Sequence, residues 1–148
     1  MNLVLASKAP RECRNVLENL LFFNPRQHLV RDGIIESLEH FGHPQVVEMP
    51  DGLSVRIKDH DIQTLFAFDR DRPDDTLVGV VLFLRTSRSE VAVLHVAVHP
   101  DYALQGEHVG MGLGVILVEK VKDICRRIVG VERIVFFYRR QVVIRVNM

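Results

Sequence analysis

Two long, valine-rich apolar runs lie on either side of a short polar turn. The runs cover residues 77–84 and 91–98, and residues 86–89 form the turn. Such runs are typical of central strands that are buried on both faces of a sheet. A connection this short joins antiparallel neighbours, because parallel strands need a longer crossover. The two runs therefore predict an antiparallel pair at the centre of a sheet.

A helix and a further strand follow this pair. In residues 112–128 the apolar side chains recur at helical spacing, and Lys and Arg occupy the opposite side. Residues 133–138 return to a strand pattern, and residues 142–146 suit one more strand. A strand, a helix and a strand in succession imply a right-handed crossover and at least one parallel pair.

The first part of the chain predicts helices and then antiparallel strands. Apolar residues at steps of three and four predict a helix that opens near Ala9-Pro10 and ends at Asn24-Pro25, and a second helix over residues 27–41. Residues 45–49 and 53–57 flank a turn and predict a hairpin, and residues 62–68 predict a strand. Residues 3–5 suit either a strand or the entry to the first helix. The fold class is α/β, a mixed, mostly antiparallel twisted sheet flanked by helices on both faces, as one domain over residues 1–148.

Composition narrows the class of function. Lys plus Arg and Asp plus Glu both number 19, so overall charge does not favour a nucleic-acid binder. No apolar run approaches the ~18 residues of a membrane span, and the N-terminus lacks a signal-peptide pattern. Cys13 and Cys125 lie outside metal-ligand spacings, and the seven histidines do not form a ligand set, so we expect no metal site. These features predict a cytoplasmic protein with no membrane or nucleic-acid partner.

A glycine-rich segment at the start of the helix predicts an anion site. It reads Val109-Gly110-Met111-Gly112-Leu113-Gly114 and follows the strand of residues 91–98. Free N–H groups and the helix dipole favour negative charge there, and glycines allow close approach to phosphate oxygens. A P-loop and a Rossmann fingerprint do not fit, because Val115-Ile116 follows the last glycine and the spacing is Gly-x-Gly-x-Gly. Tight packing of the helix on the strand is the alternative explanation for these glycines.

Three motifs together resemble the GNAT superfamily of acetyl-coenzyme A-dependent N-acetyltransferases. They are Leu77-Val78-Gly79, the stretch from His95 through Pro100 to Tyr102, and the glycine turn. The resemblance covers residues 9–138 and is strongest over residues 77–128. It implies acetyl-coenzyme A as co-substrate and a primary amine, on a small molecule or a protein, as acceptor.

The resemblance also assigns residues to the coenzyme. The pantetheine arm would lie where the strand of residues 91–98 separates from that of residues 133–138, bound by backbone groups of Val96, Ala97 and Val98. The pyrophosphate would be held by backbone N–H groups of Val109, Gly110, Met111, Gly112, Leu113 and Gly114.

Three residues are candidates for catalysis. His95 suits a general base, because its ordinary pKa lies near neutrality; a buried structural histidine is the alternative. Glu90 would act as a base through water, or else is a solvated turn carboxylate. Tyr138 would be the general acid for the leaving thiolate, or else is an aromatic residue at a strand end.

The chain departs from the family pattern at three places. Val109 replaces the usual Arg or Gln, residues 103–108 are an insertion, and only ten residues follow Tyr138. The short tail predicts a homodimer in which the last strand pairs with another subunit. These departures leave a non-catalytic acyl-coenzyme A binding or regulatory module, and more remotely a pure interaction domain, as alternatives to an N-acetyltransferase.

Overall fold

A computed structural model describes residues 2–22, 38–39, 41–58, 60–72, 76–102, 112–136 and 142–146. In chain order the elements are β1 (Leu3–Ala6), the 3₁₀ turn η1 (Arg11–Cys13), α1 (Arg14–Phe22), β2 (Pro44–Met49), β3 (Gly52–Ile57), β4 (His60–Asp69), β5 (Leu77–Ser87), β6 (Glu90–Val98), the 3₁₀ turn η3 (Pro100–Tyr102), α3 (Leu113–Arg126), β7 (Arg133–Phe136) and β8 (Val142–Arg145). Most of the predicted second helix and the insertion at residues 103–108 lie outside the described residues.

The described strands form an eight-stranded sheet with one parallel pair. Their order is β2-β3-β4-β5-β6-β7-β8, and β1 branches from β4. Every pair is antiparallel except β6 and β7, which α3 connects. The mixed, mostly antiparallel sheet and its parallel crossover are therefore confirmed.

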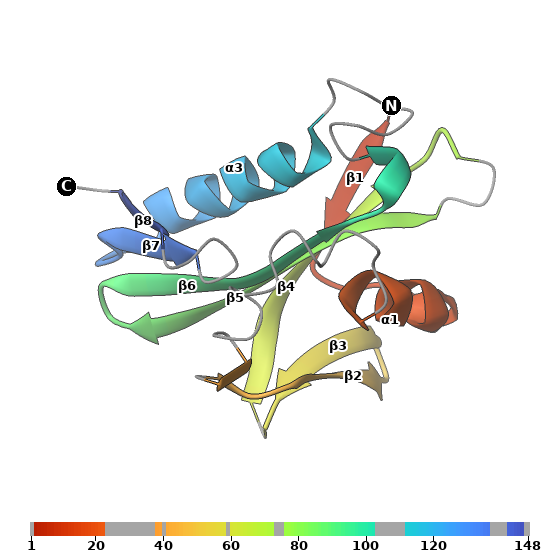
Figure 1. Ribbon diagram of the computed structural model, residues 1–148, viewed down its shortest axis with the longest axis horizontal. Coiled ribbons are helices and arrows are strands. Elements are labelled where there is room, and N and C mark those ends of the chain that lie inside the picture. The colour runs from red at the N-terminus through yellow and green to blue at the C-terminus, as the bar shows by residue number, and fades with distance from the viewer. Residues whose placement is uncertain are drawn as a thin grey trace.

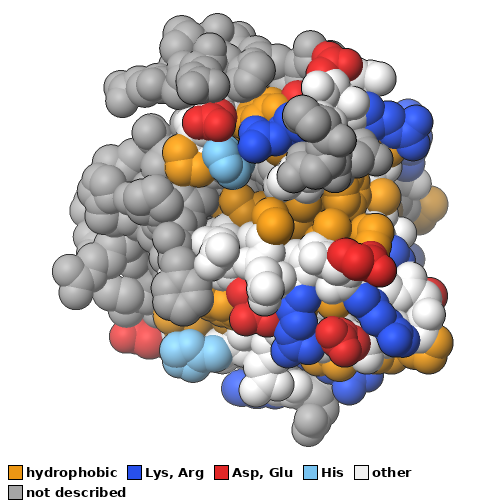
Figure 2. Space-filling model, turned by 90° about the vertical axis from the view of Figure 1, so that its right-hand side faces the viewer, with side chains coloured by type: hydrophobic (Ala, Val, Ile, Leu, Met, Phe, Trp, Pro, Cys, Tyr) orange, Lys and Arg blue, Asp and Glu red, His pale blue; other side chains and the backbone are white. Residues whose placement is uncertain are grey.

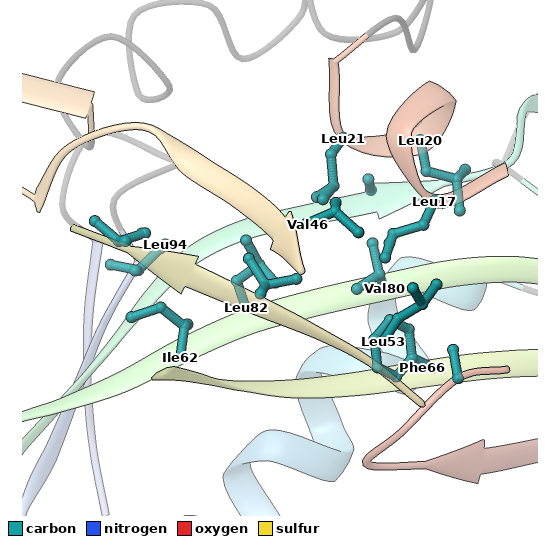
Figure 3. Close-up of a cluster of buried hydrophobic side chains, with 14 of the residues drawn as sticks. Leu17, Leu20, Leu21, Val46, Leu53, Ile62, Phe66, Val80, Leu82 and Leu94 are labelled. Atoms are coloured by element: carbon teal, nitrogen blue, oxygen red, sulfur yellow. The ribbon is translucent and has the colours of Figure 1, made fainter. Parts of the chain in front are cut away.

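The two described helices cover opposite faces of the sheet, as Figure 1 shows. On one face, Leu17, Leu20 and Leu21 of α1 pack against apolar side chains of β2 to β6, drawn in Figure 3. On the other face, Leu113, Leu117, Val121 and Cys125 of α3 pack on β5, β6 and β7. Burial of apolar surface on both faces explains why the central strands read as continuous hydrophobic runs.

The chain enters its first helix later than the sequence pattern predicts. Residues 3–5 are part of strand β1, which pairs with β4. Ala9 then bridges to Leu53, whose N–H donates a 2.8 Å hydrogen bond to the Ala9 carbonyl. Since this carbonyl belongs to the sheet, helical structure begins only at Arg11. A Cβ on Gly52 would lie 2.5 Å from the same carbonyl oxygen, so this bridge requires glycine there.

The C-terminal strand pairs inside its own chain. Strand β8 is antiparallel to β7, and the Val146 N–H donates a 2.7 Å hydrogen bond to the Glu132 carbonyl. The β8 strand is the last in the described sheet order, so pairing with a second subunit at its outer edge stays a prediction. Among the described residues, no helix is both long enough and apolar enough to cross a membrane.

Candidate active site

The start of α3 presents backbone donors without a side-chain cap. Gly112 precedes the helix in the left-handed conformation, with φ 56° and ψ 53°, and no side chain caps it. The Ile116 N–H bonds the Gly112 carbonyl at 3.0 Å, which is the first turn of the helix ladder. The N–H groups of Leu113, Gly114 and Val115 therefore have no acceptor within the helix. Together with the helix dipole they favour an anion at this end. The preceding residues Val109, Gly110 and Met111 lie outside the described part of the chain.

Close packing brings the start of α3 against the end of β6. A Cβ on Gly114 would lie 3.7 Å from Val98 Cγ2, which is an ordinary contact. A Cβ on Gly79 would lie 3.1 Å from both Leu113 Cδ2 and Leu117 Cδ1. Gly79 pairs with Val98 across β5 and β6, so its missing side chain lets the helix sit directly on these two strands. The residues predicted to bind pantetheine and pyrophosphate therefore meet in space as far as they are described.

A β-bulge interrupts β6 in the middle of its pairing with β5. Leu82 lies opposite His95 and Phe83 opposite Val93, so Leu94 is the extra residue. Within the described residues, the parallel ladder to β7 also ends here, at the pair Val93 and Phe136. Bulges redirect side chains, and this one brings the consecutive residues Leu94 and His95 to the wall of the same pocket. No sequence signal that we considered predicts this bulge.

His95 is a buried and uncharged histidine. It is 9% exposed, and its Nε2 atom has no hydrogen-bond partner in the described structure. Burial in this apolar setting lowers the pKa of His95 to about 4. The imidazole is therefore neutral at pH 7. It can accept a hydrogen bond, but it is a weaker base than the sequence alone suggests.

The pocket beside His95 has a volume of about 200 Å³ and lies on the α1 face of the sheet. Residues from α1, β3, β5 and β6 line it, together with residues around the start of β2. These are Leu21, Phe22, Leu38, Gly42, His43, Pro44, Ile57, Leu82, Leu94 and His95. The pocket is therefore a mostly apolar recess with two histidines in its wall.

Glu90 lies at the opposite end of β6 from the glycine turn. Its carboxylate accepts hydrogen bonds from Thr86 Oγ1 at 2.7 Å and from Arg133 Nε at 3.0 Å. These bonds lower the pKa of Glu90, with that from Thr86 as the largest cause. Glu90 lies five positions before His95 along the strand, a distance of about 16 Å. The geometry favours a structural ion pair between β6 and β7 over a role as general base.

A buried hydrogen-bond cluster anchors the residues that follow β6. The Tyr102 hydroxyl donates to Asp69 Oδ2, while Asp69 Oδ1 accepts the N–H groups of Asn2 and Asp71. The Arg72 guanidinium lies 5.7 Å from the centre of the Tyr102 ring. Sequence reasoning used Tyr102 as part of a motif but did not find its partner Asp69, which lies 33 positions earlier.

The remaining predicted site residue, Tyr138, lies outside the described residues. Within the described part of the chain, no group of three or more His, Cys, Asp or Glu residues is placed to hold a metal ion.

On the face shown in Figure 2, basic and acidic side chains are interspersed around exposed hydrophobic ones.

Comparison with known proteins gives a family and a fold. The family model described as Acetyltransferase (GNAT) family matches residues 34–143. A search of curated proteins gives no significant match. Among crystal structures, Ard1 from Thermoplasma volcanium is 14% identical with a TM-score of 0.50, and the match covers 92% of this chain and 71% of that one. This similarity supports the fold alone.

Two further structures have lower TM-scores. The loading GNATL domain of CurA from Lyngbya majuscula is 18% identical with a TM-score of 0.47, over 92% of this chain and 64% of that one. The IAA acetyltransferase from Bacillus cereus ATCC 14579 is 17% identical with a TM-score of 0.46, over 91% and 65%. The chain thus spans less than two thirds of the length of these two proteins.

Proposed function

The chain belongs to the acetyltransferase (GNAT) family, and we propose that it transfers an acetyl group from acetyl-coenzyme A to a primary amine of a small molecule or a protein. One observation carries the choice of site. The uncapped start of α3 and the end of β6 meet at Gly79, where a side chain would separate them. This arrangement places backbone donors for an anion next to the end of a strand that carries a bulge four residues earlier, at Leu94.

The described residues fit the coenzyme in two ways. The N–H groups of Leu113 and Gly114, behind the left-handed Gly112, would hold the diphosphate, since this helix end favours negative charge. Backbone groups of Val96, Ala97 and Val98 would bind the pantetheine arm. The coenzyme supplies an acyl thioester when it is bound.

His95 would act on the acceptor side. Its neutral imidazole is suited to accept an N–H hydrogen bond and so to orient an amine. Tyr138 remains our candidate for the acid that protonates the leaving thiolate. A backbone N–H near the bulge would stabilise negative charge on the carbonyl oxygen.

A specific observation also favours the alternative of a non-catalytic acyl-coenzyme A binding module. Burial lowers the pKa of His95 to about 4, and Glu90 is engaged by Thr86 and Arg133. Neither residue is then a strong base at pH 7. Such a module would bind the coenzyme without acetylating any amine, and the enzyme would do both.

Thermal stability in the presence of acetyl-coenzyme A tests the proposal. A ligand at a hundredfold excess over its dissociation constant should add about 2.7 kcal/mol of stability. We expect Gly114→Glu to abolish this gain, because a carboxylate at the helix start repels the diphosphate. Gly114→Gln is the matched control, with a side chain of the same size and no charge. A Cβ at this position makes only an ordinary contact, 3.7 Å from Val98 Cγ2, and Gly114 is partly exposed.

Three results are distinguishable. The enzyme is supported if acetyl-coenzyme A stabilises the protein, if Gly114→Gln reduces this stabilisation less than Gly114→Glu does, and if thiol is released in the presence of an amine. Stabilisation without thiol release over a broad set of amines supports the binding module. No stabilisation by acetyl-coenzyme A contradicts both proposals.

A further inference from the structure

The pocket beside the bulge has the size and lining of a site for a small ring. Its volume of about 200 Å³ exceeds that of an apolar cavity of ~150 Å³ that binds benzene. Seven apolar side chains, Gly42 and the histidines His43 and His95 form its wall. None of these ten described lining residues is Asp, Glu, Lys or Arg. The described part of the wall therefore offers apolar contact and two imidazoles, and no carboxylate that would balance an ammonium ion.

The wall of this pocket contains an unsatisfied polar atom. His95 Nε2 has no hydrogen-bond partner in the described structure, and the residue is only 9% exposed to solvent. Buried polar atoms without partners are rare, because they lose their hydrogen bonds to water. A ligand atom at this position would restore the bond. The pocket is thus complementary to a ligand that is apolar over most of its surface and carries one polar group.

The wall of the pocket is continuous with the part of β6 that we propose to bind the pantetheine arm. Leu94 and His95 form the bulge of β6, and they directly precede Val96, Ala97 and Val98. The pocket lies on the α1 face of the sheet, whereas α3, with the proposed diphosphate site, lies on the other. A molecule in the pocket would therefore approach the bulge from the face opposite to α3.

We propose that this pocket is the acceptor subsite, and that it takes an aromatic amine or another compact apolar amine that is uncharged at neutral pH, with the amine N–H donating to His95 Nε2. This inference rests on the proposed acetyl transfer. In that reaction the nitrogen lone pair forms a bond to the thioester carbonyl carbon and the carbon–sulfur bond breaks. The nitrogen loses its proton to solvent, directly or through His95, and the leaving thiolate takes a proton from the candidate acid Tyr138, which solvent then reprotonates.

The absence of a carboxylate among the described lining residues selects the protonation state of the amine. An alkylammonium ion in this pocket would lose its hydration without gaining a carboxylate partner among the described lining residues, which is unfavourable. It would also need a base strong enough to remove its proton before attack. An aromatic amine is already neutral at pH 7, so its lone pair is available while its N–H donates a hydrogen bond to the imidazole.

The acyl chain of a longer acyl-coenzyme A is the competing occupant. Its carbon atoms would fit the apolar lining equally well. It would bring no donor or acceptor to His95 Nε2, however, and the buried nitrogen would stay unsatisfied. The unpartnered His95 Nε2 therefore favours the amine over the acyl chain as the occupant of the pocket.

Binding of small rings tests the pocket without any need for acetyl transfer. Calorimetry or ligand-observed NMR would compare aniline, toluene and cyclohexylamine on the unmodified protein and on His95→Leu. We expect aniline to bind about three- to tenfold more tightly than toluene, the range for one uncharged hydrogen bond. His95→Leu should remove this advantage while toluene still binds. Equal binding of aniline and toluene to the unmodified protein, or preferred binding of cyclohexylamine, would overturn the proposal.

A second measurement separates this proposal from the proposed function. With acetyl-coenzyme A, kcat/KM for aniline should exceed that for cyclohexylamine by at least about tenfold. Acetylation of cyclohexylamine in preference to aniline contradicts the subsite and leaves the enzyme intact. If butanoyl-coenzyme A displaces aniline and acetyl-coenzyme A does not, the pocket belongs to the donor and the proposal fails. If acetyl-coenzyme A does not bind, the proposed function fails and the ring-binding comparison still decides the nature of the pocket.

Discussion

The buried hydroxyl of Tyr102 donates a 2.5 Å hydrogen bond to the buried carboxylate of Asp69, and so ties the segment after β6 to the end of β4. The bond from Tyr102 is the largest cause of the lowered pKa of Asp69. Burial and, after it, the same bond raise the pKa of Tyr102. Because Tyr102 follows the end of β6, this contact fixes the chain directly after the strand proposed to bind the pantetheine arm.

Replacement of Tyr102 by Phe should therefore destabilise the fold. The substitution keeps the ring but leaves Asp69 Oδ2 without its donor, at a cost of about 1–3 kcal/mol. Urea unfolding of the two proteins measures the difference. The double variant Tyr102→Phe with Asp69→Ala should lose less stability than the sum of its two single changes, because the partners share one interaction. Strict additivity would show that the bond contributes nothing.

Two glycine-to-alanine substitutions should have opposite effects on stability. At Gly79 the new methyl group would lie 3.1 Å from the side-chain ends of Leu113 and Leu117, and because both leucines are fully buried their displacement should cost about 1–3 kcal/mol. At Gly114 the contact would be ordinary, and alanine in a helix should add about 0.5–1 kcal/mol. Urea midpoints measure both changes. A stable Gly79→Ala variant would contradict the close packing inferred for this strand.

The pH dependence of stability should report the burial of His95. Its pKa is about 4 in the folded protein against 6.5 as the ordinary value, so the unfolded chain binds more protons between these values. Stability then falls as pH falls through this window, by about 2 kcal/mol between pH 7 and pH 5. Urea unfolding of the unmodified protein and of His95→Leu at both pH values isolates this contribution. An identical loss of stability in the variant would show that His95 is not its source.

Replacement of Glu90 by Gln should leave acetyl transfer nearly unchanged. Glu90 pairs with Arg133 across β6 and β7 in a partly exposed position, so the loss of the ion pair should cost at most about 1 kcal/mol. Steady-state kinetics with acetyl-coenzyme A and an accepted amine test this. A large fall in kcat without a change in the urea midpoint would return Glu90 to the role of general base.

Patterns within short stretches of sequence predicted most elements of this protein. Local periodicity and turn chemistry predict the two central strands, the hairpin around Asp51 and the helix after Gly112. The parallel crossover followed from the order of elements, because connections of this kind have one hand. Leu77-Val78-Gly79, the stretch from His95 to Tyr102 and the glycine turn indicated the family, because together they resemble its motifs.

Tertiary structure alone decided the state of the candidate site. Whether His95 is a base or a buried neutral imidazole depends on its surroundings, which include residues up to 74 positions earlier, such as Leu21. The bond between Tyr102 and Asp69 likewise joins segments that are distant in sequence. Periodicity is a property of neighbouring residues, so the sequence by itself determined the elements and their order. Burial and electrostatic environment arise from long-range contacts, so only the tertiary structure decided the chemistry of the side chains in the site.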